Sequence, residues 1–269
     1  MTQNNGATTG AKTPDVSVVF PAYNESKNIT ELVRRVDESF SGSGASLEMI
    51  VVDDNSPDGT AQVVESLKSQ YPNLKLLVRK DERGLATAVV RGWEKAEGKY
   101  LAVMDSDLQH PTDLVLRLYK AAVAQGADMA VASRKVEGGG VGDWAFHRIV
   151  ISNVANWIAK IFLPKSLFRI SDTTTGCFLF EGSKVNLQKL SPHGFKIFLE
   201  VLVRGRFSKT VEVGYVFNTR SHGTSKMTFK QDVEFIYHLL KLGLVTGEAA
   251  VPIVGVSVLA LLAYKLLAG

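Results

Sequence analysis

The stretch YLAVMDSDLQHPT, residues 100–112, places two carboxylates directly after a short apolar run. The run predicts a buried strand, so Asp105 and Asp107 are expected where that strand ends. Open α/β sheets bind ligands at the carboxyl ends of their strands. Paired carboxylate oxygens suit Mg²⁺ or Mn²⁺, which hold a diphosphate through one or two carboxylates and phosphate oxygens. Because such acidic pairs are also common in turns, the prediction of a metal site depends on the neighbouring strand ends.

The chain around this stretch alternates short β-branched runs with helical spacing. Strands are expected at residues 16–20, 48–52, 74–78, 100–104 and 129–132, and helices at residues 26–40, 58–70, 84–96 and 112–125. This order predicts an α/β fold with a mostly parallel central sheet and helices on both faces. Further strands are expected at residues 175–180 and 210–217, and further helices at residues 143–163, 195–206 and 229–244.

Two other strand ends carry polar residues of the same kind. VVFPAYNE, residues 18–25, offers a proline, an aromatic ring and a carboxylate that can hold a flat base, although a plain connection would look similar. VVDDNSPDGT, residues 51–60, adds two acids; its Ser-Pro-Asp-Gly turn is explained by helix capping, whereas the adjacent acids are not. RKDERGL, residues 79–85, is either a loop facing a diphosphate or a solvated run of charges. The convergence of these loops on one sheet edge predicts a binding site.

Composition limits the classes of function. The chain has 269 residues, a formal charge of +4 and a single cysteine, Cys177, so no intrachain disulfide can form. Residues 1–13 are polar and small, and they are expected to be a disordered tail before a catalytic domain at residues 14–228. The basic residues are scattered and no nucleic-acid-binding module is recognisable, so nucleic acid is not an expected partner.

The C-terminal end has the composition of a membrane anchor. Residues 249–264 carry no charge, and residues 249–268 would reach about 30 Å as a helix, enough to cross a bilayer. We therefore expect an amphipathic helix at residues 229–247 and a transmembrane anchor at residues 248–269; a buried C-terminal helix is the alternative. Lys226, Lys230 and Lys241 precede the anchor and Lys265 follows near its end, so the positive-inside rule predicts a cytosolic catalytic domain.

A second stretch, residues 143–168, mixes aromatic and basic residues. This mixture suits a helix that lies in the headgroup region of a membrane, where an isoprenoid tail would enter. Packing into the core accounts equally well for about half of these side chains.

Cationic side chains are available for phosphate. Arg134 directly follows the fifth expected strand, and a guanidinium can grip a phosphate bidentately. Arg148 and Ser152 lie one helical turn apart and can add to such a site. Arg220 and Lys226 flank a glycine-containing loop that can close over donor phosphates.

Together these motifs resemble a known family. VVFPAYNE, VVDDNSPDGT, ERGLATAVVRG, MDSDLQHP, the Ser-Arg pair at 133–134, GFKIFLEVLVRG and RSHGTSK resemble the dolichyl-phosphate mannosyltransferases of glycosyltransferase family 2, in order and spacing, from about residue 15 to 245. The resemblance implies a GT-A fold and inverting transfer of mannose from GDP-mannose to dolichyl or another polyprenyl phosphate. Mg²⁺ or Mn²⁺ would be the cofactor.

The resemblance also implies roles for individual residues. The donor nucleotide would be held by Pro21, Tyr23, Glu25, Asp54, Asp105, Arg220 and Lys226. The metal would be held by Asp105, Asp107 and Gln109, and the acceptor phosphate by Arg134, Arg148 and Ser152. Asp107, Arg134 and Arg148 would serve catalysis.

The sequence departs from the family pattern in two places. Thr224 stands where an acidic residue is usual, and DTTTGCF, residues 172–178, replaces a proline-containing Ser-Gly-Phe form. Both departures leave the donor sugar open, so a polyprenyl-phosphate glucosyltransferase that uses UDP-glucose is an alternative. From a different class, a non-catalytic membrane-associated subunit that binds a nucleotide sugar is the other alternative.

Overall fold

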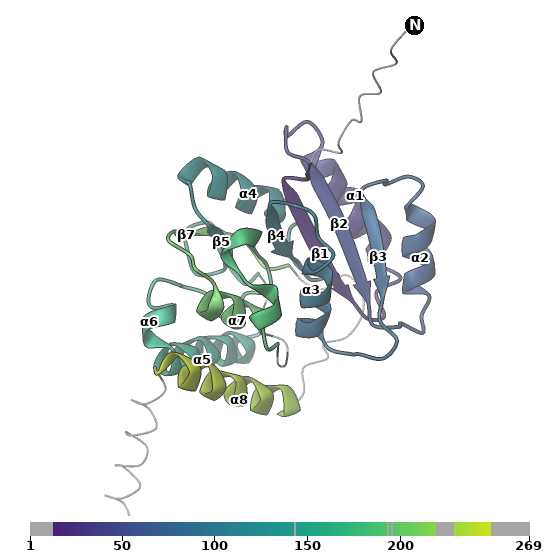
Figure 1. Ribbon diagram of the computed structural model, residues 1–269. Coiled ribbons are helices and arrows are strands. Elements are labelled where there is room, and N and C mark those ends of the chain that lie inside the picture. The colour runs from purple at the N-terminus through teal and green to yellow at the C-terminus, as the bar shows by residue number, and fades with distance from the viewer. Residues whose placement is uncertain (1–12, 143, 193, 195, 219–228, 249–269) are drawn as a thin grey trace, which may run out of the picture.

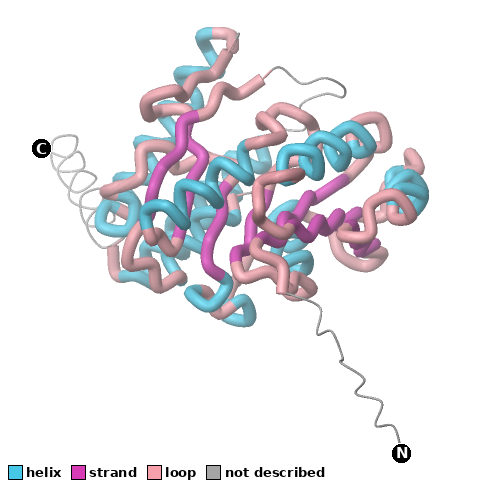
Figure 2. Tube along the Cα trace, turned by 90° about the horizontal axis from the view of Figure 1, so that it is seen from above, coloured by secondary structure: helices cyan, strands magenta, loops and turns pink. Residues whose placement is uncertain are grey.

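The computed structural model describes residues 13–142, 144–192, 194, 196–218 and 229–248. It contains a seven-stranded sheet in the order β3-β2-β1-β4-β6-β5-β7, with helices on both faces (Figures 1 and 2). The predicted α/β fold with a mostly parallel sheet is therefore confirmed.

All the expected strands are present. They are β1 (Val16–Ala22), β2 (Leu47–Asp53), β3 (Leu74–Val78), β4 (Tyr100–Val103), β5 (Met129–Ser133), β6 (Phe178–Glu181) and β7 (Thr210–Gly214). Strand β6 pairs antiparallel with β4 and β5, and every other pairing is parallel. The sequence placed the start of β6 at residue 175, three residues too early. Thr175 instead makes local hydrogen bonds, in which its hydroxyl contacts the carbonyl oxygen and the backbone N–H of Cys177.

The sheet divides the hydrophobic core into two layers, and helices cover each face. The helices are α1 (Ile29–Phe40), α2 (Thr60–Leu67), α3 (Leu85–Trp93), α4 (Leu114–Gln125), α5 (Phe146–Phe162), α6 (Pro164–Leu167), α7 (Ile197–Arg204) and α8 (Phe229–Thr246). Short 3-10 turns follow β6 at Gly182–Lys184 and Leu187–Lys189. Side chains alternate across a strand, so Val18 and Phe20 of β1 pack with α1 and α4, whereas Val19 packs with α3.

The antiparallel direction of β6 matters for the site. Its first residue, Phe178, pairs with Val103 near the end of β4 and with Val131 of β5. Residues 172–177 therefore arrive at the edge of the sheet where the parallel strands β4 and β5 end. A parallel β6 would have brought them to the opposite edge.

Helix α5 lies beside α8 on one side of the molecule (Figure 1). Ala159 of α5 and Leu163, which follows the helix, are buried in the core. Phe146, Ile151, Val154 and Trp157 are exposed, and Trp157 keeps 67% of its surface accessible. Core packing therefore accounts for part of this stretch and leaves these four apolar side chains exposed.

Within the described residues, none of the helices has the length and apolar character needed to cross a membrane. The expected anchor, apart from its first residue, lies outside those residues. That first residue, Glu248, is buried and accepts hydrogen bonds from the backbone N–H groups of Lys165 and Ser166 at 2.7 and 3.1 Å. The end of α8 is thus fixed to α6.

Candidate active site

The loops after β1, β2 and β4 meet at one edge of the sheet. The backbone N–H of Asp54 donates to the carbonyl oxygen of Ala22 at 3.0 Å, and the Ser106 hydroxyl donates to the carbonyl oxygen of Pro21 at 2.7 Å. The expected convergence is present, because the three strands are parallel neighbours and their carboxyl ends coincide.

The second loop holds the first one in place. Ser56, Thr60 and Asp58 accept hydrogen bonds from the backbone N–H groups of residues 24, 25 and 26, at 2.9, 3.0 and 3.0 Å. Asp53 in turn accepts from the backbone N–H of Ser56 at 3.0 Å. The turn that follows β2 therefore positions the backbone around Tyr23 and Glu25, beyond its local capping role.

Asp54 forms a buried ion pair with Arg79. Nε of Arg79 donates to Oδ1 of Asp54 at 2.7 Å, and the backbone N–H of Gly84 donates to Oδ2 at 2.9 Å. Arg79 also donates to the carbonyl oxygen of Gly84 at 2.9 Å and to the hydroxyl of Thr87 at 2.8 Å. Asp54 thus fixes the loop after β3 against the loop after β2, in addition to any contact it makes with a nucleotide.

The aromatic ring of the first loop faces the third loop. The guanidinium of Arg83 lies over the ring of Tyr23, with 5.1 Å between Cζ and the ring centroid. A cation over an aromatic face is an attractive arrangement that a planar base can join by stacking. Glu25 lies in the same loop and accepts from Nδ2 of Asn28 at 2.7 Å.

The acidic loop after β4 has hard oxygen ligands in a tight turn. Asp107 is buried and accepts from the backbone N–H of Gln109 at 3.1 Å, while Nε2 of Gln109 donates to the carbonyl oxygen of Asn218 at 3.1 Å. Leu108 between them has a positive φ of 60°, a left-handed conformation that costs a non-glycine residue about 1–2 kcal/mol. Such strain is typical of functional turns.

The donor set of this loop fits a divalent cation that shares its shell with phosphate. In the described part of the chain no three acidic, histidine or cysteine side chains cluster closely enough to hold a metal ion. Asp105 and Asp107 are two carboxylates and Gln109 is an amide. Mg²⁺ commonly binds through one or two carboxylates and completes its shell with substrate phosphates and water, so two carboxylates and an amide oxygen suffice.

Gly176 and His110 lie next to the carboxylate of Asp105. A Cβ at position 176 would lie 2.7 Å from Oδ2 of Asp105, so only glycine leaves the carboxylate its place. His110 is buried with its Nδ1 4.0 Å from that oxygen, and its ring stacks on Tyr215 at 5.4 Å. Burial lowers the pKa of His110 to about 4, so the imidazole is neutral at physiological pH.

Arg134 follows β5 and forms a buried pair with Asp172. Nε and Nη2 of Arg134 donate to Oδ2 and Oδ1 of Asp172 at 2.7 and 2.8 Å, and Nη2 also donates to the hydroxyl of Thr174 at 2.7 Å. Burial works against ionisation of Asp172, but the hydrogen bonds and charge of Arg134 more than offset it, and the pKa of Asp172 falls to about 2. The guanidinium also lies 5.3 Å from the ring of Trp144 and 5.9 Å from that of Phe217.

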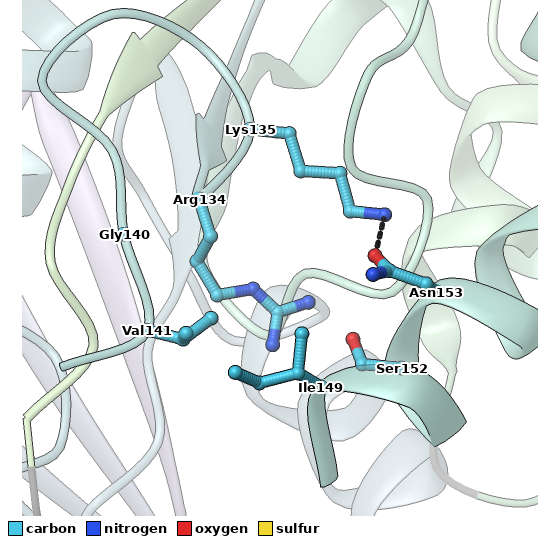
Figure 3. A pocket seen from close by; sticks show the side chains of 7 residues that line it. All are labelled: Arg134, Lys135, Gly140, Val141, Ile149, Ser152 and Asn153. Atoms are coloured by element: carbon cyan, nitrogen blue, oxygen red, sulfur yellow. Dashed lines mark hydrogen bonds between the residues drawn. The ribbon is translucent and has the colours of Figure 1, made fainter. Parts of the chain in front are cut away.

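A cavity of about 190 Å³ opens beside Arg134 (Figure 3). It is lined by Arg134, Lys135, Gly140, Val141, Ile149, Ser152 and Asn153. Arg134 and Ser152, expected to serve one phosphate, thus face one cavity. Arg148 does not line it; its guanidinium stacks on Trp144 at 4.5 Å, and Trp144 contacts Arg134.

Residues 172–176 connect this cavity with the acidic loop. Asp172 and Thr174 bind Arg134, and Gly176 lies against Asp105. The carbonyl oxygen of Thr174 accepts from Nζ of Lys196 at 2.9 Å. Burial, reinforced by Arg134, lowers the pKa of Lys196 to about 8, while Asp105 and Asp172 oppose the shift.

The sequence did not identify every residue of this site. Arg79, Lys135, Asn153, Asp172, Thr174, Gly176 and Lys196 were not assigned functional roles. The sequence offered a hint for two of them. Arg79 begins the loop that was considered for a diphosphate, and Asp172 begins the segment that departs from the family pattern. Arg220 and Lys226, expected on the donor side, lie outside the described residues.

Comparison with known proteins identifies the chain as a glycosyltransferase. A sequence model described as glycosyl transferase family 2 matches residues 17–185, and the chain belongs to that family. It is 41% identical over 233 residues to the dolichol-phosphate mannosyltransferase of Pyrococcus furiosus, a match that covers 87% of this chain and 65% of that protein. It is 34% identical over 238 residues to the dolichol-phosphate mannosyltransferase of Saccharomyces cerevisiae, covering 85% of this chain and 86% of the yeast protein. The resemblance noted in the motifs is thereby confirmed.

Solved structures share the fold at lower identity. Mannosyl-3-phosphoglycerate synthase from Rubrobacter xylanophilus superimposes with a TM-score of 0.62 at 16% identity, covering 86% of this chain and 73% of that one. Glucosyl-3-phosphoglycerate synthase from Mycobacterium tuberculosis, solved with Mn²⁺, UDP-glucose and phosphoglyceric acid, superimposes with a TM-score of 0.61 at 16% identity, covering 86% and 80%. At this identity the likeness supports the GT-A-like fold and nothing finer.

Proposed function

We propose that this glycosyltransferase transfers mannose from GDP-mannose to dolichyl or another polyprenyl phosphate, with inversion at the anomeric carbon. The observation that carries the proposal is the juxtaposition at one sheet edge of an acidic loop and a cavity lined by Arg134 and Ser152. The names of the relatives at 34% and 41% identity support the same reaction.

The donor would lie across the loops after β1, β2 and β4. Pro21, Tyr23, Glu25 and Asp54 are proposed to hold the guanosine, with Arg83 over the Tyr23 ring on one side. Arg220 and Lys226 remain candidates for the donor phosphates.

Asp105, Asp107 and Gln109 would hold Mg²⁺ or Mn²⁺. When bound, the ion would stabilise the charge that develops on the leaving diphosphate. The burial of Asp107 and the hydrogen bond that it accepts from the backbone N–H of Gln109 hold this carboxylate in place before any ligand arrives, and Gly176 leaves room for the carboxylate of Asp105. Prior fixation removes a reorganisation cost from the transfer step.

The acceptor needs little chemical activation. A phosphate monoester has a second pKa near 6, so at neutral pH it already carries a nucleophilic anionic oxygen. Arg134 and Ser152 would orient that oxygen, and Arg148 would hold Trp144 against Arg134 or contact the phosphate directly. A strong general base is therefore unnecessary.

The enzyme is further proposed to act at a membrane, with its catalytic domain in the cytosol. The exposed Phe146, Ile151, Val154 and Trp157 of α5, beside α8, offer apolar side chains to the headgroup region. The C-terminal residues 249–269 would then cross the bilayer as an anchor.

One experiment tests the reaction. Purified full-length protein is incubated with Mg²⁺, a polyprenyl phosphate and either labelled GDP-mannose or labelled UDP-glucose. We expect label in the lipid extract from GDP-mannose alone, and loss of that label when EDTA is added. Transfer from UDP-glucose would favour a glucosyltransferase, and the absence of transfer from both donors would contradict the proposed reaction.

A further inference from the structure

The cavity beside Arg134 contains one cation whose charge is already compensated. The guanidinium of Arg134 is paired bidentately with the carboxylate of Asp172, which is fully buried and ionised at neutral pH because its pKa is about 2. The pair therefore has no net charge. An anion in the cavity would receive hydrogen bonds from Arg134 but little net Coulombic attraction from the pair.

Lys135 provides a second positive charge in the same cavity. Its ammonium extends across one side to Asn153, where Nζ donates to Oδ1 at 2.9 Å (Figure 3). No carboxylate of the described residues lies within ion-pair distance of this ammonium. Partial burial lowers the pKa of Lys135, Asp172 opposes the shift, and Arg134 and Lys160 add to it. An anion in the cavity would therefore offset the cost of burying this ammonium.

The same contact orients the amide of Asn153. An ammonium can only donate hydrogen bonds, so the amide must present its oxygen to Lys135, and Nδ2 is left as a donor. Ser152 supplies a hydroxyl to the cavity wall, and Nη1 of Arg134 has no acceptor among the described residues. The lining therefore combines several donors with the charge of Lys135.

We propose that Lys135 makes this cavity selective for a phosphate monoester dianion over a phosphodiester monoanion. The inference rests on the proposed function, in which an oxygen of the acceptor phosphate forms a bond to the anomeric carbon while the bond from that carbon to the leaving diphosphate breaks. The acceptor enters with two negative charges and the product leaves as a diester with one. Lys135 attracts the acceptor more strongly than the product, so it favours acceptor binding and product release together.

Binding without any donor tests this selectivity. Full-length protein in non-ionic detergent at pH 8 is titrated by calorimetry with geranyl phosphate and with its methyl diester. We expect the wild type to prefer the monoester by about tenfold, the size of effect that one partly screened charge produces. Lys135→Gln keeps an amide that can donate to Asn153 but removes the charge, so the preference should fall to within about twofold. Lys135→Arg should restore it.

Lys160→Gln is the matched control. Lys160 lies near enough to influence Lys135 but does not line the cavity, so its removal should leave the monoester preference unchanged. Retention of the full preference by Lys135→Gln, or an equal loss in Lys160→Gln, would overturn the proposal, as would a wild type without preference. Failure of the labelled-sugar assay would instead contradict the proposed reaction, because the titration contains no sugar donor.

Discussion

A methyl group at position 176 would lie 2.7 Å from Oδ2 of Asp105, so these two residues cannot both keep their places once the glycine is replaced. The clash involves the far end of a side chain that can rotate, and the fold should therefore survive the substitution. The carboxylate would move away from the position proposed for metal binding.

For Gly176→Ala we therefore expect metal-dependent affinity for GDP to fall at least about tenfold, measured by calorimetry with Mn²⁺, with little change in the thermal midpoint. Gly182→Ala is the control, since this glycine lies beyond the far end of β6, where the nearest atoms to its Cβ would be those of Leu101 and the carbonyl oxygen of Lys99 at 3.3–3.5 Å. Equal GDP affinity in Gly176→Ala and wild type would show that Asp105 does not serve the metal.

Asp105→Ala and Asp107→Ala should each abolish transfer. Removal of one carboxylate weakens stabilisation of the leaving diphosphate, and we expect a rate loss of about a thousandfold or more with the fold intact. Labelled-mannose transfer with saturating Mg²⁺ measures this loss. Asp113→Ala removes an exposed acid just after the same loop and should transfer mannose normally. Normal turnover of either loop variant would remove the metal assignment.

Arg134→Lys should impair use of the lipid phosphate and spare the donor. A lysine keeps the charge but loses the planar fork that binds Asp172 and faces the cavity. We expect the acceptor KM to rise about tenfold or more while GDP affinity changes less than about threefold. Arg79→Lys is the converse control, because Arg79 supports Asp54 on the donor side. A collapse of GDP affinity in Arg134→Lys would assign Arg134 to the donor.

The pair between Arg134 and Asp172 should also make the free energy of unfolding depend on pH in acid. The pKa of Asp172 falls from its ordinary value of 3.8 to about 2 in the folded protein. A carboxyl with a lowered folded pKa contributes stability above its unfolded pKa and loses it as pH falls through the folded pKa. The contribution, about 2 kcal/mol at pH 7, should thus shrink between pH 4 and pH 2.

Urea unfolding of wild type and Asp172→Asn at several pH values measures this contribution. The difference in unfolding free energy should be constant above about pH 5 and narrow below pH 4. A difference that stays constant down to pH 2 would mean that the ion pair does not account for the effect of the substitution.

Removal of residues 249–269 should leave the transfer activity of the folded domain intact. Truncation should follow Glu248, because that residue binds α6 through the backbone of Lys165 and Ser166 and belongs to the folded domain. We expect the shortened protein to become largely peripheral in flotation assays and to keep activity on a short-chain polyprenyl phosphate. Its activity on long-chain lipid in vesicles should fall through lost effective concentration. An unfolded or wholly inactive product would favour the buried-helix alternative.

The fold was predictable because its signals are local. Within the described residues, apolar runs and helical spacing identified every strand and every α-helix except α6, a single turn that begins at Pro164. The antiparallel direction of β6 was not predictable, since the same short apolar run pairs equally well in either direction. Its start was misplaced because the local hydrogen bonds of Thr175 replace strand pairing.

The site residues that directly follow strands were predictable, because their signals are also local. Asp105, Asp107 and Arg134 directly follow strands, so their position is fixed by secondary structure alone. The partners of these residues come from distant segments: Asp172 reaches Arg134 across 38 positions, and Gly176 meets Asp105 from the lead-in to β6. Contacts of that kind depend on strand order, which the sequence pattern does not contain.

The place of β6 between β4 and β5 also fixes the spacing between the two halves of the proposed site. Neighbouring strands lie about 4.8 Å apart, so one strand inserted between β4 and β5 holds their ends about 10 Å from each other. The acidic loop follows one of those ends and Arg134 follows the other. That span is comparable with one hexose and a phosphate. If the donor and acceptor lie as proposed above, the backbone spacing of the sheet, rather than a flexible loop, would set the distance between the leaving group and the incoming nucleophile.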